Sequence, residues 1–308
     1  PVLDLAKWPV FIFSCGQNTN PEYYTYLCEH IVSQGFIVVA PHVDDRDNDY
    51  PGPFNRRVWD IRLLLRLIAQ LNSDEKATLK HHPKFAKAPT ANLFYQKMNL
   101  NCVGIFGHSF GASTVIKMLS EQETEEEAQQ ALKKGPVARA KKNKQTQPTD
   151  KLLSPRFDPD LSIPTIACGL AIDPWMFPIP TSDHPTLNET LMVVRSDGWF
   201  THDNLQKLQG FYHNATKGAY EIVMKDTMHL NYTDLPFYIS NPYIGQFFPP
   251  SLLKEEDSSK DLLGKADARV VLGIVVELSL AFFTYHFKNK DTSKLFKLRA
   301  SEHFSFEA

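Results

Sequence analysis

The chain has 308 residues, of which 43% are hydrophobic, enough apolar material to fill the core of one large domain. Its 33 basic and 35 acidic residues leave a formal net charge of -2, which gives no support for a surface that binds nucleic acid. The four cysteines are scattered and lack the Cys-x-x-Cys spacing of zinc and redox sites.

Apolar segments of strand length recur along the chain, at residues 9–14, 35–41, 101–106, 165–173, 191–196 and 220–225. Their near-continuous apolar runs are typical of parallel strands that are buried on both faces. Amphipathic segments between them predict helices at residues 22–33, 55–71, 111–120 and 204–212. The alternation predicts an α/β fold, in which a mostly parallel sheet has helices on both faces, and a single domain over residues 1–308.

Residues 121–160 interrupt this alternation. An acidic block around Glu125 is followed by a basic block around Lys141 and then by the polar run "NKQTQPTD". The segment has too few apolar residues to pack a core, so we expect a solvated, flexible insertion. A mobile lid or a basic, lipid-facing patch is the alternative.

The apolar run "VVLGIVVELSLAFFTYHF" at residues 270–287 has the length of a membrane-spanning helix. Polar side chains such as Glu277, Ser279 and His286 interrupt it. Helices that are hydrophobic on most sides also occur in the cores of large domains. We therefore expect a largely buried helix near the end of the domain.

The pentapeptide "GHSFG" at residues 107–111 follows a predicted strand and precedes a predicted helix. This context is typical of the G-x-S-x-G nucleophile elbow, a sharp turn that lifts a serine above the edge of the sheet. Gly107 and Gly111 remove side chains that would clash in such a turn. Ser109 is therefore predicted to be a nucleophile.

A serine needs a base, and the base needs an orienting acid. In α/β-hydrolases these residues follow in the order Ser, Asp, His. Asp173 ends the run "CGLAID", and His229 lies in "KDTMHLNYTD", directly after a predicted strand. Taken alone, Asp173 could be a buried aspartate that caps a turn, and His229 could be an ordinary surface histidine. Their order in the chain and their positions after strands favour a triad.

An oxyanion hole in this fold uses two backbone amides. One belongs to the residue after the nucleophile, here Phe110, and the other to the loop after an early strand. The loop "FSCGQN" at residues 13–18 makes Gln17 the expected second donor.

These motifs resemble the platelet-activating factor acetylhydrolase family, calcium-independent phospholipases A2 with an α/β-hydrolase fold. Similar segments are "PVFIFSCG", "SQGFIVVAPHVDDRD", "GHSFGAS", "MHLNYTD" and "LSLAFFTYHF". The most specific is "LAIDPWMFP", since the family carries an Asp followed by Trp-Met-Phe-Pro. The chain departs from the family at Cys15, where the oxyanion loop usually has His, and at Leu230, where a polar residue is usual.

The resemblance implies catalytic roles for Ser109, Asp173 and His229, and oxyanion roles for Gln17 and Phe110. It further implies that Trp175, Met176 and Phe177 line the approach of the substrate, although core packing is the alternative for each. The implied reaction is hydrolysis of the sn-2 short or oxidised acyl ester of phospholipids, as in 1-alkyl-2-acetylglycerophosphocholine esterases, without metal or cofactor. Two strands that begin the family's domain are expected to be missing from this chain.

Two other functions stay open at the level of sequence. The fold could serve a general carboxylesterase or a cutinase-like polyester hydrolase, because fold alone does not fix the substrate. It could also serve a catalytically silent binding protein, although such a protein has no need to keep all three triad residues.

The expected partner is a phospholipid, with peripheral contact to a membrane or lipoprotein and none to nucleic acid. Residues 22–33, which include Tyr23, Tyr24 and Leu27, are a candidate contact helix, with packing against the sheet as the alternative. Localisation is open between cytoplasmic and secreted or membrane-associated. Three Asn-x-Ser/Thr triplets, at Asn188, Asn214 and Asn231, lean weakly toward the latter.

Overall fold

The computed structural model of the chain describes residues 7–43, 52–76, 92–121, 161–179, 186–247, 263–289 and 304–307. The strands are β1 (Trp8–Ser14), β2 (Ile37–Val39), β3 (Met98–His108), β4 (Ile166–Ile172), β5 (Thr190–Ser196), β6 (Ala219–Met224) and β7 (Phe304–Glu307). They form one sheet in the order β2-β1-β3-β4-β5-β6-β7. The first six strands are parallel and only β7 is antiparallel, so the predicted mostly parallel α/β fold is confirmed.

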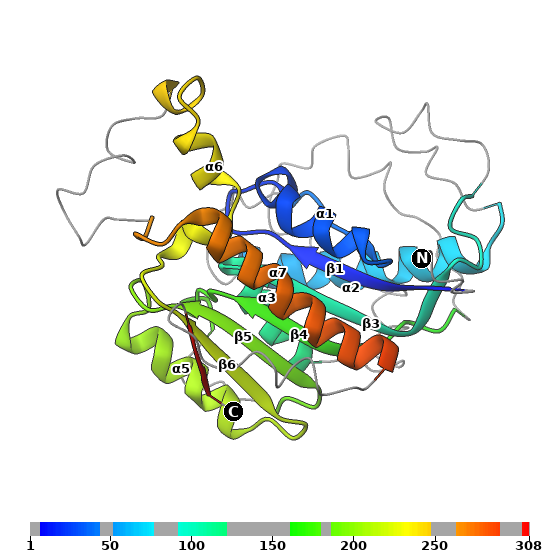
Figure 1. The fold of residues 1–308 in the computed structure, drawn as a ribbon. Coiled ribbons are helices and arrows are strands. Elements are labelled where there is room, and N and C mark those ends of the chain that lie inside the picture. Colours follow the sequence, from blue (N-terminus) through cyan, green and yellow to red (C-terminus); the bar gives the residue numbers. More distant parts are fainter. Residues whose placement is uncertain are drawn as a thin grey trace, which may run out of the picture.

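Helices connect the strands and cover the sheet (Figure 1). They are α1 (Thr25–Ser33), α2 (Gly52–Ser73), α3 (Phe110–Ser120), α5 (His202–His213), α6 (Leu235–Ser240) and α7 (Ala268–Thr284). Shorter turns are η1 (Pro21–Tyr24), η7 (His229–Tyr232), η8 (Gly245–Phe247) and η10 (Tyr285–Asn289). Each helix predicted from the sequence is present within a few residues, but the first begins as the turn η1.

The sheet separates two hydrophobic cores. Val10 and Ile12 of β1 pack into the first core, with buried side chains of α2, α3 and α5. Phe11 and Phe13 of the same strand pack into the second, with buried side chains of α1 and α7. Because successive side chains of a strand point to opposite faces, one apolar strand can serve both cores. The expectation of helices on both faces is confirmed.

Aromatic rings fill the second core. The ring of Phe11 lies 4.0 Å from that of Phe283 and 5.2 Å from that of Phe36, centroid to centroid. Gly104 of β3 makes room for it, since a Cβ atom at that position would lie 2.1 Å from the Phe11 ring. Ring contacts of this kind therefore attach α7 to the centre of the sheet.

Helix α7 belongs to the apolar segment that raised the membrane question. Within the described residues, the helical stretch Ala268–Phe287 is long and apolar enough to cross a membrane, and 44% of its apolar window is buried in the protein. Val271, Leu272 and Val275 are among the buried side chains. The helix expected to be largely buried is therefore buried on the face that packs on the sheet.

Two other expectations concern the charged insertion and the candidate contact helix. Most of the charged insertion, residues 122–160, lies outside the described residues, and the single domain stays a prediction. In the candidate contact helix, Tyr24 and Leu27 are buried in the second core, whereas Tyr23 is exposed. Packing against the sheet is therefore the main role of that helix.

The strand order creates a place for a site. The connection from β1 leads to β2 on one side, whereas β3 pairs with β1 on the other. In open α/β sheets, ligands bind at the carboxyl ends of strands next to such a reversal of direction. The loop after β1 and the turn after β3 therefore meet where a substrate is expected.

Candidate active site

Ser109 sits in the turn between β3 and α3 with a backbone φ of 59° and ψ of -121°. Residues other than glycine rarely adopt a positive φ, so contacts with neighbouring residues must hold the backbone of Ser109 in this conformation. Its amide donates to the carbonyl oxygen of Ile172 at 2.9 Å, and its own carbonyl accepts from the amide of Trp175 at 3.1 Å. The end of β4 thus fixes the turn that presents the serine.

The glycines that flank the turn are required by the end of β1. A Cβ atom at Gly111 would lie 2.0 Å from the carbonyl oxygen of Ser14, and one at Gly107 would lie 2.6 Å from the same atom. Neither glycine has a positive φ, since among the glycines that the structure describes only Gly35 and Gly218 do. These two residues therefore allow β1 to approach the elbow closely, rather than forming the turn themselves.

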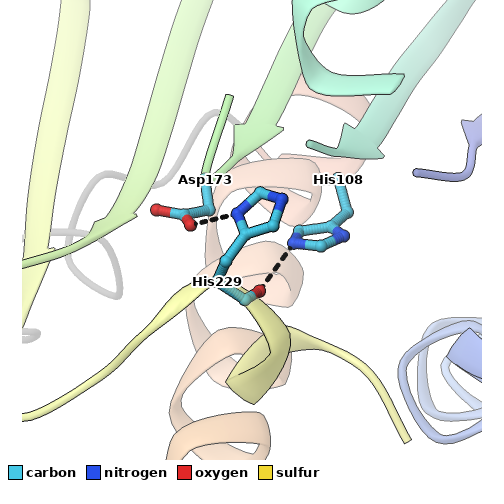
Figure 2. A group of neighbouring side chains, drawn as sticks. All are labelled: His108, Asp173 and His229. Carbon is cyan, nitrogen blue, oxygen red and sulfur yellow. Dashed lines mark hydrogen bonds and ion pairs between the residues drawn. The ribbon is translucent and has the colours of Figure 1, made fainter. Parts of the chain in front are cut away.

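Three predicted side chains form a continuous hydrogen-bonded chain. His229 Nε2 lies 2.7 Å from Ser109 Oγ, and His229 Nδ1 lies 2.6 Å from Asp173 Oδ2 (Figure 2 shows the second contact). An ionised carboxylate can only accept, so the shared proton resides on Nδ1 and leaves Nε2 to accept the serine hydroxyl. The geometry is that of a Ser-His-Asp triad.

Asp173 is fully buried and directly follows β4. Its Oδ1 atom accepts from both the amide and the hydroxyl of Ser196, each at 2.8 Å. Together with the bond to His229, these donors stabilise the charged form of a carboxylate that has no contact with water. Ser196 ends the neighbouring strand β5 and is a part of the site that the sequence analysis did not identify.

A second histidine, His108, contacts the backbone of His229. His108 Nε2 donates to the carbonyl oxygen of His229 at 2.9 Å, and His108 Nδ1 accepts from the Tyr24 hydroxyl at 2.9 Å (Figure 2 shows the first of these bonds). Burial lowers the pKa of His108 well below 6.5, and the nearby His229 adds to this shift. His108 is therefore a neutral structural link between the base and Tyr24.

The side chain of Trp199 packs on the other histidine. Its ring stacks on that of His229 with centroids 3.7 Å apart and planes tilted by 20°. The ring of His108 lies 4.6 Å from the same imidazole. Such contacts restrict the rotation of His229 and help to keep its Nε2 atom directed at Ser109.

His108, Asp173 and His229 also form a group whose candidate metal ligands lie within 4.8 Å of one another. Each of the histidine nitrogens already takes part in a hydrogen bond, to Ser109, Asp173, Tyr24 or a backbone carbonyl. A metal ion would have to break these bonds, so the arrangement fits a triad better than a metal centre.

The two residues expected to supply oxyanion amides come from adjoining segments. Phe110 is the first residue of α3, and Gln17 lies in the loop after β1. That loop packs against the elbow, because a Cβ atom at Gly111 would lie 2.5 Å from the carbonyl oxygen of Cys15. The topology thus brings both segments to one place, while their role as donors stays a prediction.

Trp175, Met176 and Phe177, the three residues expected to line the approach of the substrate, have different environments. Met176 is fully buried in the first core, and its amide donates to Asn204 Oδ1 at 3.1 Å. Trp175 and Phe177 stack with ring centroids 5.5 Å apart, and Phe177 is 59% exposed. Core packing therefore describes Met176, whereas the stacked rings of Trp175 and Phe177 lie beside the Trp175 amide that donates to the Ser109 carbonyl, with Trp175 partly buried against the first core.

The sequence analysis also did not identify Tyr24, Arg57 and Trp199. Tyr24 and Arg57 are fully buried polar side chains from helical segments that the periodicity assigned to packing. The only signal in the sequence was an arginine within an otherwise apolar helix face. Among the glycosylation triplets, Asn231 is buried, and its Oδ1 accepts from the amides of Met228 and Gly264, so it cannot carry a glycan.

Comparisons with known proteins can be set beside this geometry. The sequence model of one family, described as "Platelet-activating factor acetylhydrolase, isoform II", matches residues 3–50 and 53–301. The platelet-activating factor acetylhydrolase of Cavia porcellus is 24% identical over 314 residues, which cover 92% of this chain and 58% of the relative. That of Gallus gallus is 21% identical over 327 residues, which cover 92% and 63%. The chain thus spans about three fifths of the length of these relatives.

Among solved structures, a ferulic acid esterase from Streptomyces cinnamoneus matches with a TM-score of 0.61 and 15% sequence identity. The match covers 98% of this chain and 74% of the esterase. At this level of identity the similarity shows a shared α/β-hydrolase fold.

Proposed function

Since the chain belongs to the platelet-activating factor acetylhydrolase, isoform II family, we propose that it is a serine-dependent carboxylic ester hydrolase. Its proposed substrates are phospholipids with a short or oxidised acyl chain at the sn-2 position. The observation that carries the proposal is the chain of hydrogen bonds from Ser109 through His229 to Asp173, with Ser109 in a strained turn.

In the first half of the reaction, His229 Nε2 accepts the hydroxyl proton of Ser109 while Oγ forms a bond to the ester carbonyl carbon. Asp173 stabilises the imidazolium that results. The carbonyl oxygen becomes an oxyanion, and the amides of Gln17 and Phe110 donate hydrogen bonds to it. Collapse of this intermediate breaks the ester C–O bond, and the imidazolium returns its proton to the leaving lysophospholipid oxygen.

In the second half, water replaces the alcohol. His229 takes a proton from the water while the water oxygen attacks the acyl-serine. The second tetrahedral intermediate then releases the fatty acid, and the proton returns to Ser109 Oγ. Each cycle consumes one water and restores the enzyme, so these steps require no cofactor.

The phospholipid preference draws support from the relatives, which are named platelet-activating factor acetylhydrolases, and from the aromatic surface of Trp175 and Phe177. This surface adjoins the peptide that holds the Ser109 carbonyl. Flat apolar rings at the surface offer contact to an acyl chain or to the edge of a lipid layer. Phe177 is the more exposed of the two and is the one expected to touch lipid first.

The test is labelling with a fluorophosphonate, which traps an activated serine, followed by location of the adduct by mass spectrometry. We expect an adduct on Ser109 that is lost in His229→Ala, and ester hydrolysis that is lost in Ser109→Ala. Ser120→Ala is the matched control, because that hydroxyl bonds only the carbonyl of Lys117 at the far end of α3. Folded protein without label, or undiminished hydrolysis in Ser109→Ala, contradicts the proposal.

Substrate class is tested separately. Rates on a phospholipid with an sn-2 acetyl group, on its long-chain counterpart and on a simple aryl acetate are compared at equal enzyme concentration. A preference for the sn-2 acetyl phospholipid supports the full proposal, whereas activity on the aryl ester alone reduces it to a general carboxylesterase.

A further inference from the structure

Arg57 of α2 is fully buried and lies directly behind the loop that follows β1. An arginine keeps its positive charge in proteins, and burial of that charge is unfavourable unless its donors are satisfied. Here Nη1 donates to the carbonyl oxygen of Cys15, and Nη2 donates to that of Gly16 at 2.9 Å. Two consecutive peptide groups of the loop are thus held by one guanidinium.

The carbonyl and N–H of a trans peptide point in opposite directions. In the first of the two peptides, between Cys15 and Gly16, both of these groups are hydrogen-bonded, one on each side. Arg57 holds the Cys15 carbonyl, and the N–H of the same peptide, which belongs to Gly16, donates to the Tyr24 hydroxyl at 3.0 Å. Arg57 and Tyr24 therefore hold this peptide from its two sides.

The second peptide joins Gly16 to Gln17. Arg57 and the hydroxyl of Thr19 both donate to its carbonyl oxygen, each at 2.9 Å, so these hydrogen bonds together set the direction of the Gln17 N–H. A positive charge at the carbonyl oxygen also withdraws electrons from the peptide nitrogen and makes its N–H a stronger donor. The N–H in question is the one assigned to the oxyanion hole.

The guanidinium also contacts the segment that carries the other expected donor. Its central carbon lies 4.6 Å from the centroid of the Phe110 ring, a cation–π contact. One side chain of α2 thus touches both segments from which the oxyanion amides come.

We propose that Arg57 is the positioning residue of the oxyanion hole, a role that rests on the proposed function. Arg57 directs and polarises the Gln17 amide through the Gly16 carbonyl, and it fixes the loop against Phe110. Arg57 does not touch the substrate in this role. It acts on the transition state through the peptide, so its removal lowers kcat more than it changes KM.

Arg57→Met tests this role, since methionine fills similar space and has no donor. We expect kcat on an aryl acetate to fall by about 10²-fold, near the loss caused by removal of one oxyanion donor, with a smaller change in KM. Arg57→Lys keeps the charge but cannot bond both carbonyls in a fixed fork, so an intermediate kcat is expected.

A second measurement separates positioning from mere stability. The ratio of kcat/KM for an ester to that for its thionoester reports on the oxyanion hole, because sulfur is larger and accepts hydrogen bonds weakly. This ratio is expected to fall in Arg57→Met and, by less, in Arg57→Lys. Arg66→Met is the matched control, since Arg66 is a buried arginine on the same helix and the bonds from Arg57 and Tyr24 to the loop do not involve it.

The outcomes distinguish the two proposals. If hydrolysis depends on Ser109 but both Arg57 variants keep the wild-type kcat and thionoester ratio, the role of Arg57 is overturned and the proposed function stands. An equal fall of the ratio in Arg66→Met also overturns it, because the effect is then one of stability. Absence of any Ser109-dependent hydrolysis in the wild-type protein overturns both.

Discussion

The triad and the oxyanion loop meet at the same edge of the sheet, yet different parts of the chain hold them. Ser109 and Asp173 follow adjacent strands, and hydrogen bonds from the ends of β4 and β5 fix them. Residues 15–17 are instead held by the side chains of Arg57 and Tyr24, which come from helical segments, and by the hydroxyl of Thr19 in the same loop. Ser109 and Asp173 thus depend on the ends of neighbouring strands, whereas residues 15–17 depend on side-chain hydrogen bonds, from Arg57 at long range and from Thr19 and Tyr24 nearby in the chain.

The largest effect is expected in the triad. Asp173→Asn keeps the size of the side chain but can present an N–H to His229 Nδ1, which favours the wrong tautomer of the imidazole. We expect kcat on an aryl acetate to fall by about 10³-fold or more. Asp203→Asn, on the surface beside Lys207, is the control and should leave kcat unchanged. An Asp173→Asn enzyme with more than a tenth of the wild-type kcat would show that the acid does not orient the base.

Gly111→Ala tests the close contact between the turn that carries Ser109 and the loop that follows β1. The new methyl group would lie 2.0 Å from the carbonyl oxygen of Ser14 and 2.5 Å from that of Cys15, so β1 and α3 must separate. Such overpacking costs about 1–3 kcal/mol in the free energy of unfolding, and kcat should fall with it because the oxyanion loop moves away from the elbow. Urea denaturation and steady-state rates provide the measurements.

Gly273→Ala is its control, since a Cβ atom at this position in α7 meets nothing within 4 Å. Alanine there should stabilise the helix by up to about 1 kcal/mol and leave activity unchanged. Equal stability of the two variants would contradict the close approach of β1 to the elbow.

The smallest effect concerns His108, which links the base to Tyr24. Its pKa is lowered well below 6.5 in the folded protein, so between that pKa and about 6.5 the unfolded chain binds more protons. Stability is therefore complete above pH 6.5 and falls as the pH drops below it, by at most about 1.4 kcal/mol per pH unit for this group. Urea denaturation at pH 7.5, 6.5 and 5.5 measures the slope.

His286 contributes in the same direction, because burial lowers its pKa to about 4. Its ring lies 4.6 Å from that of Phe282, centroid to centroid, and it forms no part of the hydrogen-bonded chain of Ser109, His229 and Asp173. His286→Leu removes that contribution and should leave a residual slope that belongs to the site. If the slope between pH 6.5 and 5.5 disappears in this variant, His108 is not held neutral by the fold.

The sequence was sufficient to predict most of the fold and to select Ser109, Asp173 and His229, which the structure brings into one hydrogen-bonded chain, while their catalytic roles stay a prediction. Strands buried on both faces produce continuous apolar runs, and the order Ser, Asp, His at strand ends follows from the topology of the sheet. Strand β7 was not predicted, because four residues carry too little pattern. Arg57 and Ser196 could not be assigned either, since hydrogen bonds to residues far along the chain, a backbone carbonyl for Arg57 and the Asp173 carboxylate for Ser196, leave no local pattern in the sequence.

Strand β7 has a consequence for how the protein is made. Residues 304–307 pair with β6, whose own residues end at Met224, so about eighty residues are synthesised between the two strands. Until the last of them leaves the ribosome, β6 presents an open row of backbone donors and acceptors that another chain could pair with. During the interval between translation of β6 and arrival of β7, a nascent chain is thus open to pairing with another chain along this edge.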